Sequence, residues 1–207
     1  MSDTIDYYFT SISPFAYLGH KKMVEVAKNH GKSINFKPFD LFGVWKVSGA
    51  VPPGQRPLVR QRYRKIEIQR IAVMRDTHMN QSPKFFPTDQ TQADLCIAAL
   101  LLDGQDASQF SFEVGRAVWE RDLQIADESV LSSLLTECGK DAAAIIELSK
   151  TDDAARMREK NTQDAIVADA IGSPAYVYNG EVFWGQDRLE HLEQMITSGR
   201  HAFSSDI

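Results

Sequence analysis

The first part of the chain has the hydrophobic pattern of a strand, a helix and a second strand. Ile5–Phe9 is β-branched and aromatic and stops at a polar cluster, which is typical of a buried strand that ends in a loop. Ser13 and Pro14 then favour a helix start, because serine is a good N-cap and proline fits the first turn. The helix is expected to end at Gly31, and Ser33–Phe39 predicts a second strand. Two strands joined by a helix favour a parallel, right-handed βαβ unit.

Glycine, proline and helical periodicity divide the middle of the chain. Asp40–Pro57 holds three of the eight prolines together with three glycines, which predicts an ordered loop and no regular element. From Leu58 to about Thr151 the apolar positions recur at helical spacing, with polar or glycine breaks that predict four or five helices. A further helix is predicted from about Asp152 to Ala170.

The strongest local signal is a β-hairpin near the C-terminus. Ala175–Tyr178 and Glu181–Trp184 have strand patterns and are joined by Asn179-Gly180. Asn-Gly suits the positive φ angles of a type I′ turn, so we expect a tight antiparallel pair. A last helix is predicted to follow, with Asp187 as its N-cap. Its apolar face comprises Leu189, Leu192, Met195 and Ile196.

The order of these elements indicates the fold. A βαβ unit followed by a β-hairpin and a helix is the layout of an α/β thioredoxin-like fold. Helical sequence separates the two halves, so we expect the fold to be interrupted by an all-helical insertion. The predicted division is a thioredoxin-like domain formed by residues 1–57 and 152–207, and a helical insertion domain formed by residues 58–151.

Composition and charge narrow the classes of function. The 207 residues carry 23 Lys and Arg against 28 Asp and Glu, a net charge of −5, so nucleic acid is not an expected partner. Cys96 and Cys138 lie far apart in apolar helical patterns, which favours reduced core thiols over a disulfide framework. The five histidines lack ligand spacing, so no metal is expected. The acidic start and the shortness of every apolar run predict a soluble cytoplasmic protein without a signal peptide or membrane span.

The turn from the first strand into the first helix is the candidate reactive position. Exposed N–H groups and the positive end of the helix macrodipole stabilise an anion at such a turn. Here Ser13 and Ala16 fill both positions of a Cys-x-x-Cys motif, which excludes thiol–disulfide exchange by the protein itself at this site. The Ser13 hydroxyl can instead donate a hydrogen bond to the thiolate of a bound cofactor and lower the pKa of that thiol. The alternative is that Ser13 serves only as an N-cap.

Two stretches near the C-terminus could hold a short peptide ligand. Pro174 starts a predicted strand, and a cis peptide bond there would leave the backbone of Ser173 available to an extended peptide such as glutathione. A trans proline that only starts the strand is the alternative. Gln186, Asp187 and Arg188 could receive the amino and carboxylate groups of a γ-glutamyl moiety, or could form an N-cap with a surface ion pair.

A basic segment and two aromatic residues raise the question of a substrate site. The cations between Arg56 and Arg75 fall around a predicted helix and do not share one face, which favours a solvated helix over a phosphate site. The expected apolar side of that helix comprises Tyr63, Ile66, Ile71 and Met74. Arg56 could still serve a substrate carboxylate, and Phe42 and Trp45 could stack on an aromatic substrate or belong to the core.

Taken in order, these stretches resemble the glutathione-dependent branch of the DsbA-like thioredoxin superfamily, which contains 2-hydroxychromene-2-carboxylate isomerase and kappa-class glutathione transferase. The resemblance covers nearly the whole chain. Its main motifs are Ser13-Pro14-Phe15-Ala16-Tyr17-Leu18, Gly172-x-Pro174 and Trp184-Gly185-x-Asp187-Arg188-Leu189.

The resemblance implies a role for each matching residue. Ser13 would interact with the glutathione thiolate, and Ser173, before a cis proline, would pair with the cysteinyl backbone. Gln186 and Asp187 would bind the γ-glutamyl end. The implied glutathione site comprises Ser13, Ser173, Pro174, Trp184, Gln186, Asp187 and Arg188, and the expected substrate site comprises Phe42, Trp45, Gln55 and Arg56.

The activity that the resemblance implies is a glutathione-dependent isomerisation. In that family a chromene-ring substrate becomes an open-chain benzylidenepyruvate, because reversible thiolate addition turns a conjugated double bond into a single bond that can rotate. The expected partners are glutathione, a small aromatic or electrophilic substrate and a second copy of the chain in a homodimer. The alternatives are a kappa-like glutathione transferase or peroxidase, and a non-catalytic thioredoxin-fold binding module.

Two positions depart from the family's pattern. Gly49-Ala50 stands where the family often has Gly-Asn, and Thr10-Ser11 lacks an aspartate commonly found shortly before the active serine. Neither change touches the residues implied to position the thiol. The missing asparagine amide bears on which substrate is accepted, so glutathione binding is the better supported half of the prediction.

Overall fold

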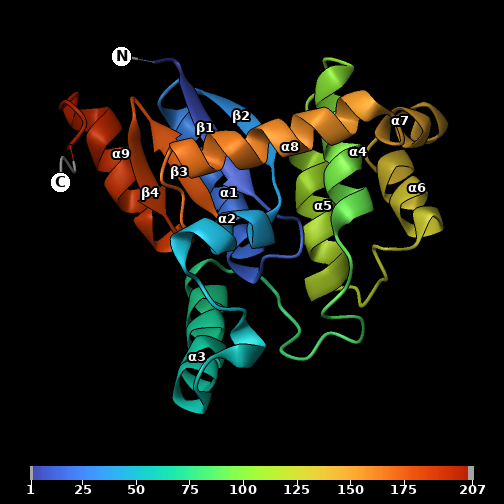
Figure 1. Cartoon of the computed structure of the whole chain (residues 1–207), viewed down its shortest axis with the longest axis horizontal. Coiled ribbons are helices and arrows are strands. Elements are labelled where there is room, and N and C mark those ends of the chain that lie inside the picture. The colour runs from blue at the N-terminus through green and yellow to red at the C-terminus, as the bar shows by residue number, and fades with distance from the viewer. Residues whose placement is uncertain (1, 205–207) are drawn as a thin grey trace.

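The N-terminal elements form the predicted parallel unit. The computed structural model describes residues 2–204, and β1 (Thr4–Phe9), α1 (Pro14–Asn29) and β2 (Ser33–Pro38) open the chain (Figure 1). β1 and β2 pair in parallel over their whole length, with Tyr7 opposite Phe36. The βαβ prediction is therefore confirmed.

The C-terminal hairpin completes a four-stranded sheet. β3 (Ala175–Tyr178) pairs antiparallel with β1 and with β4 (Glu181–Trp184), giving the strand order β2-β1-β3-β4. At the turn, Asn179 and Gly180 both have positive φ angles, 50° and 85°, as a type I′ turn requires. The sheet is thus built from both ends of the chain, with β1 and β3 in the centre.

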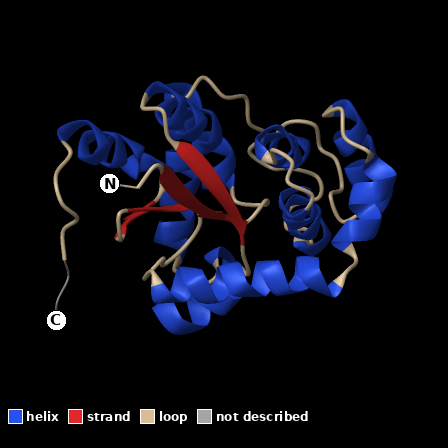
Figure 2. Ribbon diagram, turned by 90° about the horizontal axis from the view of Figure 1, so that it is seen from above, coloured by secondary structure: helices blue, strands red, loops and turns tan. Residues whose placement is uncertain are grey.

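Helices cover both faces of this sheet (Figure 2). On one face, Tyr8 of β1 packs in a cluster with Val44 of α2 (Leu41–Ser48) and Ala165 of α8 (Asp152–Val167). On the other face, Tyr7 belongs to the main core together with residues of α1 and α9 (Leu189–Ser198). Because successive side chains of a strand point to opposite faces, β1 contributes to both clusters.

Residues 58–151, the predicted insertion, contain the five helices that their periodicity allows. They are α3 (Leu58–Met74), α4 (Thr91–Leu102), α5 (Ser108–Trp119), α6 (Glu128–Glu137) and α7 (Ala142–Ser149). The main core runs from the sheet and α1 into α4, α5, α6 and α7 without a break. The structure is therefore a thioredoxin-like α/β fold with a helical insertion packed directly on it.

The segment between β2 and α3 corrects one prediction, because it contains the helix α2 and a short 3-10 helix, η1 (Pro53–Gln55). Asp40 caps α2 by accepting a hydrogen bond from the N–H of Phe42 at 3.1 Å. Gly49 ends it with a φ angle of 72°. The glycines and prolines that suggested a loop therefore lie at helix ends.

A second correction concerns the apolar face of α3. Ile71 is buried as predicted, but Tyr63, Ile66 and Met74 are exposed, and the second buried residue of the helix is Ile68. In Figure 1, α3 projects from the body of the molecule, which explains why most of its side chains are not buried.

The end of α8 also differs slightly from the prediction. The helix ends at Val167 and not at Ala170, and the chain turns at Asp169, which has a φ angle of 55°. Among the described residues, no helix has the length and hydropathy needed to cross a membrane, and no group of metal-ligating side chains gathers at one point.

Candidate active site

Ser13 lies at the N-terminus of α1 and acts as its N-cap. Its Oγ accepts a hydrogen bond from the N–H of Ala16 at 3.2 Å and donates one to the carbonyl oxygen of Ser173 at 3.2 Å. The side chain is nearly buried, at 7% exposure. The hydroxyl can therefore donate to an incoming anion only by turning away from the Ser173 carbonyl.

No general base contacts Ser13 among the residues that the structure describes. The nearest histidine in sequence, His20, is buried in α1 and its Nε2 lies 3.4 Å from Ser108 Oγ. Burial lowers the pKa of His20 to about 4, so its ring is neutral near pH 7. Since a serine without a base is a poor nucleophile, this geometry favours a hydrogen-bonding role for Ser13.

The peptide bond between Ser173 and Pro174 is cis, which decides between the two alternatives left open by the sequence. The turn is held in place because Ser173 Oγ accepts a hydrogen bond from the N–H of Thr10 at 3.1 Å. The carbonyl oxygen of Pro174 accepts one from Gly185 N at 2.9 Å. This turn thus lies directly against the loop that carries Ser13.

Trp184 and Gly172 meet beside the same turn. A Cβ atom on Gly172 would lie 2.5 Å from Trp184 Nε1, so only glycine allows the indole to lie over this backbone. Trp184 is nevertheless 51% exposed. One edge of the indole is fixed by the chain and the rest faces solvent, as the wall of a binding site would.

Gln186 lies inside the molecule and not on the surface of the site. It is 1% exposed, and its side-chain Oε1 and carbonyl oxygen accept hydrogen bonds from Arg75 at 3.0 and 3.1 Å. Arg75 also forms an ion pair with Glu190 at 2.8 Å. The oxygen of the amide predicted to meet a γ-glutamyl group is therefore engaged within the protein, whereas its Nε2 has no hydrogen-bond partner among the described residues.

Asp187 and Arg188 are open to solvent and pair with each other. Their charged groups lie 3.0 Å apart, and their side chains are 57% and 49% exposed. The prediction that Asp187 is the N-cap of the last helix is wrong, because Gln186–Arg188 forms the 3-10 helix η2 and Arg188 precedes α9. The carboxylate of Asp187 therefore does not cap a helix N-terminus.

The residues predicted to hold a substrate gather around α2. The Phe42 and Trp45 rings meet edge to face with centroids 5.5 Å apart, and the Arg56 guanidinium lies 5.8 Å from the Trp45 ring. Arg56 Nε also donates to the carbonyl oxygen of Val51 at 2.6 Å. Gln55 is exposed on η1. Three of these four residues thus form one cluster.

A buried carboxylate behind the Ser13 loop was missed by sequence reasoning. Asp94 on α4 accepts hydrogen bonds from the N–H and the hydroxyl of Ser11, at 3.1 and 2.7 Å, and Arg158 of α8 lies 3.3 Å from its other oxygen. Burial raises the pKa of Asp94 to about 6, although Arg158 and Ser11 oppose this effect. The loop before Ser13 therefore receives a carboxylate from the insertion.

The fold and this site define a class of protein. Residues 4–197 match the model of the DSBA-like thioredoxin domain, and the chain belongs to that family. The family assignment and the interrupted α/β fold agree with the expectations drawn from the sequence motifs.

Within the family, the chain is similar to 2-hydroxychromene-2-carboxylate isomerases. It is 29% identical over 197 residues to the enzyme of Sphingobium xenophagum, covering 95% of this chain and 99% of that one. A solved structure of 2-hydroxychromene-2-carboxylate isomerase superimposes with a TM-score of 0.78 at 27% identity, covering 94% of this chain and 95% of that chain. Glutathione S-transferase kappa 1 of Caenorhabditis elegans is 25% identical over 204 residues, 93% of this chain and 90% of that one.

Proposed function

We propose that the chain is a glutathione-dependent isomerase of the 2-hydroxychromene-2-carboxylate isomerase type. The observation that carries the proposal is the position of Ser13, whose hydroxyl lies at the N-terminus of α1 and against the carbonyl of Ser173. The proposal is supported by similarity over nearly the full length to isomerases that bear this name.

The donor set fits glutathione in part. The Ser173 N–H has no acceptor within residues 2–204, so it can pair with a peptide backbone. The Asp187 carboxylate is exposed and can receive the γ-glutamyl ammonium group. Trp184 offers an indole wall, whereas Oε1 of the buried Gln186 already accepts a hydrogen bond from Arg75. When bound, glutathione supplies a thiolate that adds reversibly to a conjugated double bond.

The residues of the chain would stabilise and orient that thiolate. Ser13 would rotate from the Ser173 carbonyl to donate its proton to the sulfur, while the N-terminal end of α1 adds a favourable dipole. Both effects favour the charged form of the thiol and so lower its pKa. The enzyme would then hold more of the reactive anion near neutral pH.

The substitution Ser13→Ala tests this role. We expect the variant to retain glutathione binding in calorimetry but to raise the pKa of the bound thiol, read from ultraviolet thiolate absorbance against pH. Interconversion of 2-hydroxychromene-2-carboxylate and its open-chain isomer should fall on the order of 10-fold or more, since a lost hydrogen bond to a charged group has about this effect. Ser133→Ala on α6 is the matched control, because this exposed hydroxyl bonds only its own helix.

Three outcomes would count against the proposal. An absence of heat with millimolar glutathione would leave the non-catalytic binding module as the better interpretation. An unchanged thiol titration in Ser13→Ala would remove the role given to the hydroxyl. Isomerisation that proceeds equally without glutathione would also contradict the proposed chemistry.

Glutathione conjugation is a second candidate, favoured by the similarity to a kappa-class transferase. It would use the same thiolate, but the sulfur would stay on an electrophilic product. A panel of aromatic halides and peroxides assayed beside the chromene carboxylate separates the two activities. A rate with halides alone would favour the transferase.

We also propose that the chain forms a homodimer, as the resemblance implies. The exposed apolar side chains of α3, which include Val59, Ile66 and Val73, offer a surface of the kind that subunit contacts bury. Sedimentation equilibrium of the chain and of Ile66→Glu tests this. A monomeric parent chain at micromolar concentration would contradict it.

A further inference from the structure

The Ser13 loop, residues 10–13 between β1 and α1, is fastened at both ends to the segment that contains the cis proline. The N–H of Thr10 donates to Ser173 Oγ at 3.1 Å, and the Ser13 hydroxyl donates to the carbonyl oxygen of Ser173 at 3.2 Å. Within the loop, the N–H of Ser13 donates to the carbonyl oxygen of Thr10 at 3.0 Å. The hydrogen bonds of Ser11, which lies between these two ends, go to a different part of the chain.

Ser11 is held by Asp94 of the insertion. Oδ1 of Asp94 accepts hydrogen bonds from the N–H and the hydroxyl of Ser11, at 3.1 and 2.7 Å, so one oxygen fixes both the backbone and the side chain of that residue. Two donors on one oxygen suit an ionised carboxylate, because such a group only accepts. Among the described residues, every hydrogen bond between residues 58–151 and the Ser13 loop is made by Asp94.

The helix α5 also packs against this loop but does not bond to it. The hydroxyls of Thr10 and of Ser111 on α5 are both buried, and both lack a hydrogen-bond partner within residues 2–204. Together with Ser11 they line a cavity of about 10 Å³. Packing against α5 therefore does not determine the direction of the loop, whereas the two hydrogen bonds to Asp94 do.

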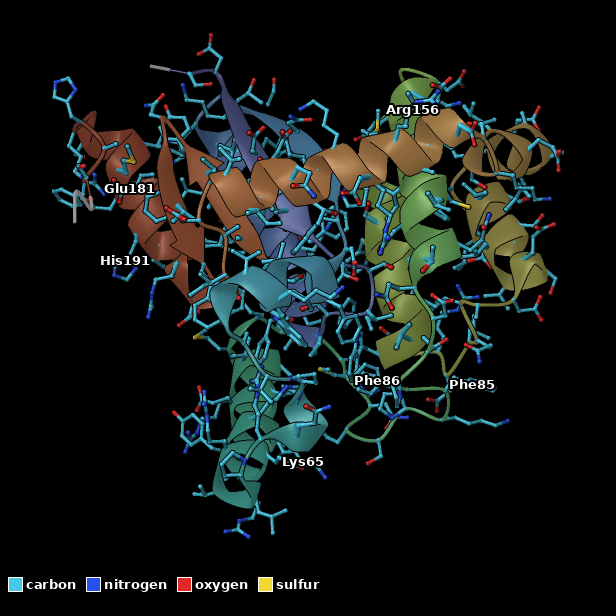
Figure 3. All side chains as sticks on the ribbon, viewed as in Figure 1. Lys65, Phe85, Phe86, Arg156, Glu181 and His191 are labelled. Carbon is cyan, nitrogen blue, oxygen red and sulfur yellow. The ribbon has the colours of Figure 1, made fainter. Side chains whose placement is uncertain are left out.

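Arg158 of α8 holds the second oxygen of Asp94. Its Nε lies 3.3 Å from Oδ2, and the side chain of Asp94 is completely buried at this contact. Arg156 on the same helix, labelled in Figure 3, is instead exposed and pairs with Asp152 and Asp153 at the start of α8. Both oxygens of Asp94 are thus engaged, one by the Ser13 loop and the other by a largely buried cation.

A charge at this position is held at a cost to the stability of the fold. Burial raises the pKa of Asp94 to about 6, although Arg158 and Ser11 lower it, so the carboxyl is ionised near pH 7 against the effect of burial. Groups whose charge is retained in this way beside a cleft are typical of functional sites. The electrostatics therefore agree with the geometry in giving Asp94 a role beyond packing.

We propose that Asp94 is a positioning residue of the candidate active site, which fixes the Ser13 loop so that the Ser13 hydroxyl is directed toward the bound ligand. Its hydrogen bonds go to Ser11 and Arg158, so it acts on Ser13 through the backbone of the loop. The ligand on which the hydroxyl acts, a glutathione thiolate, rests on the proposed function. The positioning of the loop does not.

The first test measures the loop without any ligand. Asp94→Asn keeps the size of the side chain but removes its charge and replaces one acceptor oxygen by a donor. We expect amide hydrogen exchange at Ser11 and Ser13 to accelerate on the order of 10-fold relative to the amides of β1. Glu113→Gln is the matched control, because Glu113 is a buried carboxylate of the insertion whose partners lie on its own helix. It should leave exchange in the loop unchanged.

The second test asks whether the loop acts on the thiol. In Asp94→Asn the pKa of the bound glutathione thiol should rise by about 0.5 to 1 and kcat for isomerisation should fall about 3- to 10-fold. KM for glutathione should change little, because the groups proposed to hold the peptide do not contact Asp94. In a Ser13→Ala background the effect of Asp94→Asn on the thiol should disappear, since Asp94 acts through that hydroxyl. A purely structural role would give the same further loss in both backgrounds.

Ser11→Ala covers the case in which Asp94→Asn does not fold. It removes only the hydroxyl contact at 2.7 Å and keeps the N–H contact, so exchange and thiol pKa should change in the same direction but less. Exchange that stays at the parent rate in both variants would overturn the inference.

The two tests separate this inference from the proposed function. Faster exchange in the loop of a chain that binds no glutathione would retain the positioning role and refute the thiolate chemistry. Glutathione binding with an unchanged thiol pKa in Asp94→Asn and Ser11→Ala would refute the action of Asp94 on the site and leave the proposed function standing.

Discussion

At the scale of single residues, Asp94 should make the stability of the fold depend on pH. It is completely buried between the Ser11 loop and Arg158, and burial raises its pKa to about 6 from an ordinary value of 3.8. A carboxyl group whose pKa is raised on folding contributes its full stability below the unfolded value and loses that stability as the pH rises through the folded value.

Asp94→Asn should therefore change how stability depends on pH. From this group alone, the free energy of unfolding should fall by about 2 kcal/mol between pH 4 and pH 6, and the asparagine variant should lack this fall. Urea unfolding of both chains across that range measures the difference. Parallel curves would show that Asp94 does not titrate with a raised pKa.

Titration of His20 changes the free energy of unfolding in the opposite direction, over a pH range that overlaps that of Asp94. Because burial lowers its pKa from 6.5 to about 4, the neutral ring contributes stability that is lost as the pH falls through this interval. In the parent chain the two effects partly cancel, so its unfolding curve alone does not separate them. The difference between the parent and Asp94→Asn cancels His20, which is the same in both.

Single residues were predictable where the signal is local. Ser13 caps α1 because serine followed by proline is a local preference, which the sequence shows directly. Asp94 could have been singled out as one charge in an apolar helix. Its partner Ser11 lies 83 residues away, so no local pattern could connect the two.

At the scale of elements, the turn before β3 can contact Trp184 of β4 only because Gly172 has no side chain. Gly172→Ala would place a Cβ atom 2.5 Å from Trp184 Nε1, so the indole must move. We expect a loss of about 1–3 kcal/mol in stability, a shift in tryptophan emission and weaker glutathione binding.

Gly54→Ala is the control for this substitution. A Cβ on Gly54 meets nothing within 4 Å, so the same chemical change should leave stability and emission nearly unaltered. If Gly172→Ala behaves like Gly54→Ala, the indole does not depend on the close approach.

Elements with strong local signals were predicted well, and α2 shows why others were not. The hairpin was evident because Asn179-Gly180 determines its own turn. The α2 segment contains Gly43 and ends near several prolines, so its composition suggested a loop. Its helix depends on the Asp40 cap and on packing of Val44 against Ala165, which only the folded chain supplies.

At the scale of the whole molecule, one continuous core joins the two domains that the sequence predicts, so we expect them to unfold together. Ile97 of α4, in the insertion, is completely buried in the same cluster as Ile5 of β1. Ile97→Ala should cost about 2–5 kcal/mol and lower a single unfolding transition. The measurement is coincidence of the near-ultraviolet and far-ultraviolet circular dichroism curves.

Two separate transitions would contradict that expectation and would favour residues 58–151 as an autonomous unit. The control is Ala155→Gly. Ala155 is exposed on α8, so this substitution weakens a helix without disturbing the core. It should lower stability by about 1 kcal/mol without separating the transitions.

The global arrangement was predictable from element order alone, whereas the site was predictable only in part. The sequence order β-α-β, helices, β-β-α predicts the thioredoxin layout because connection rules leave few alternatives. The cavity between α3, the loop after it and the end of α5 could not be predicted in this way, because its residues Arg64 and Trp119 come together only through tertiary packing of distant segments. Periodicity indicates which face is apolar but not which faces meet.

The position of β1 in the middle of the sheet affects how the chain is made on the ribosome. β1 and β2 are synthesised early, but the antiparallel neighbour of β1 is not complete until Tyr178 has been added. During most of translation, one hydrogen-bonding edge of the central strand therefore lacks its native partner. A nascent chain stalled before Ala175 would expose that edge, because β3, which closes it, is synthesised only after α2 to α8.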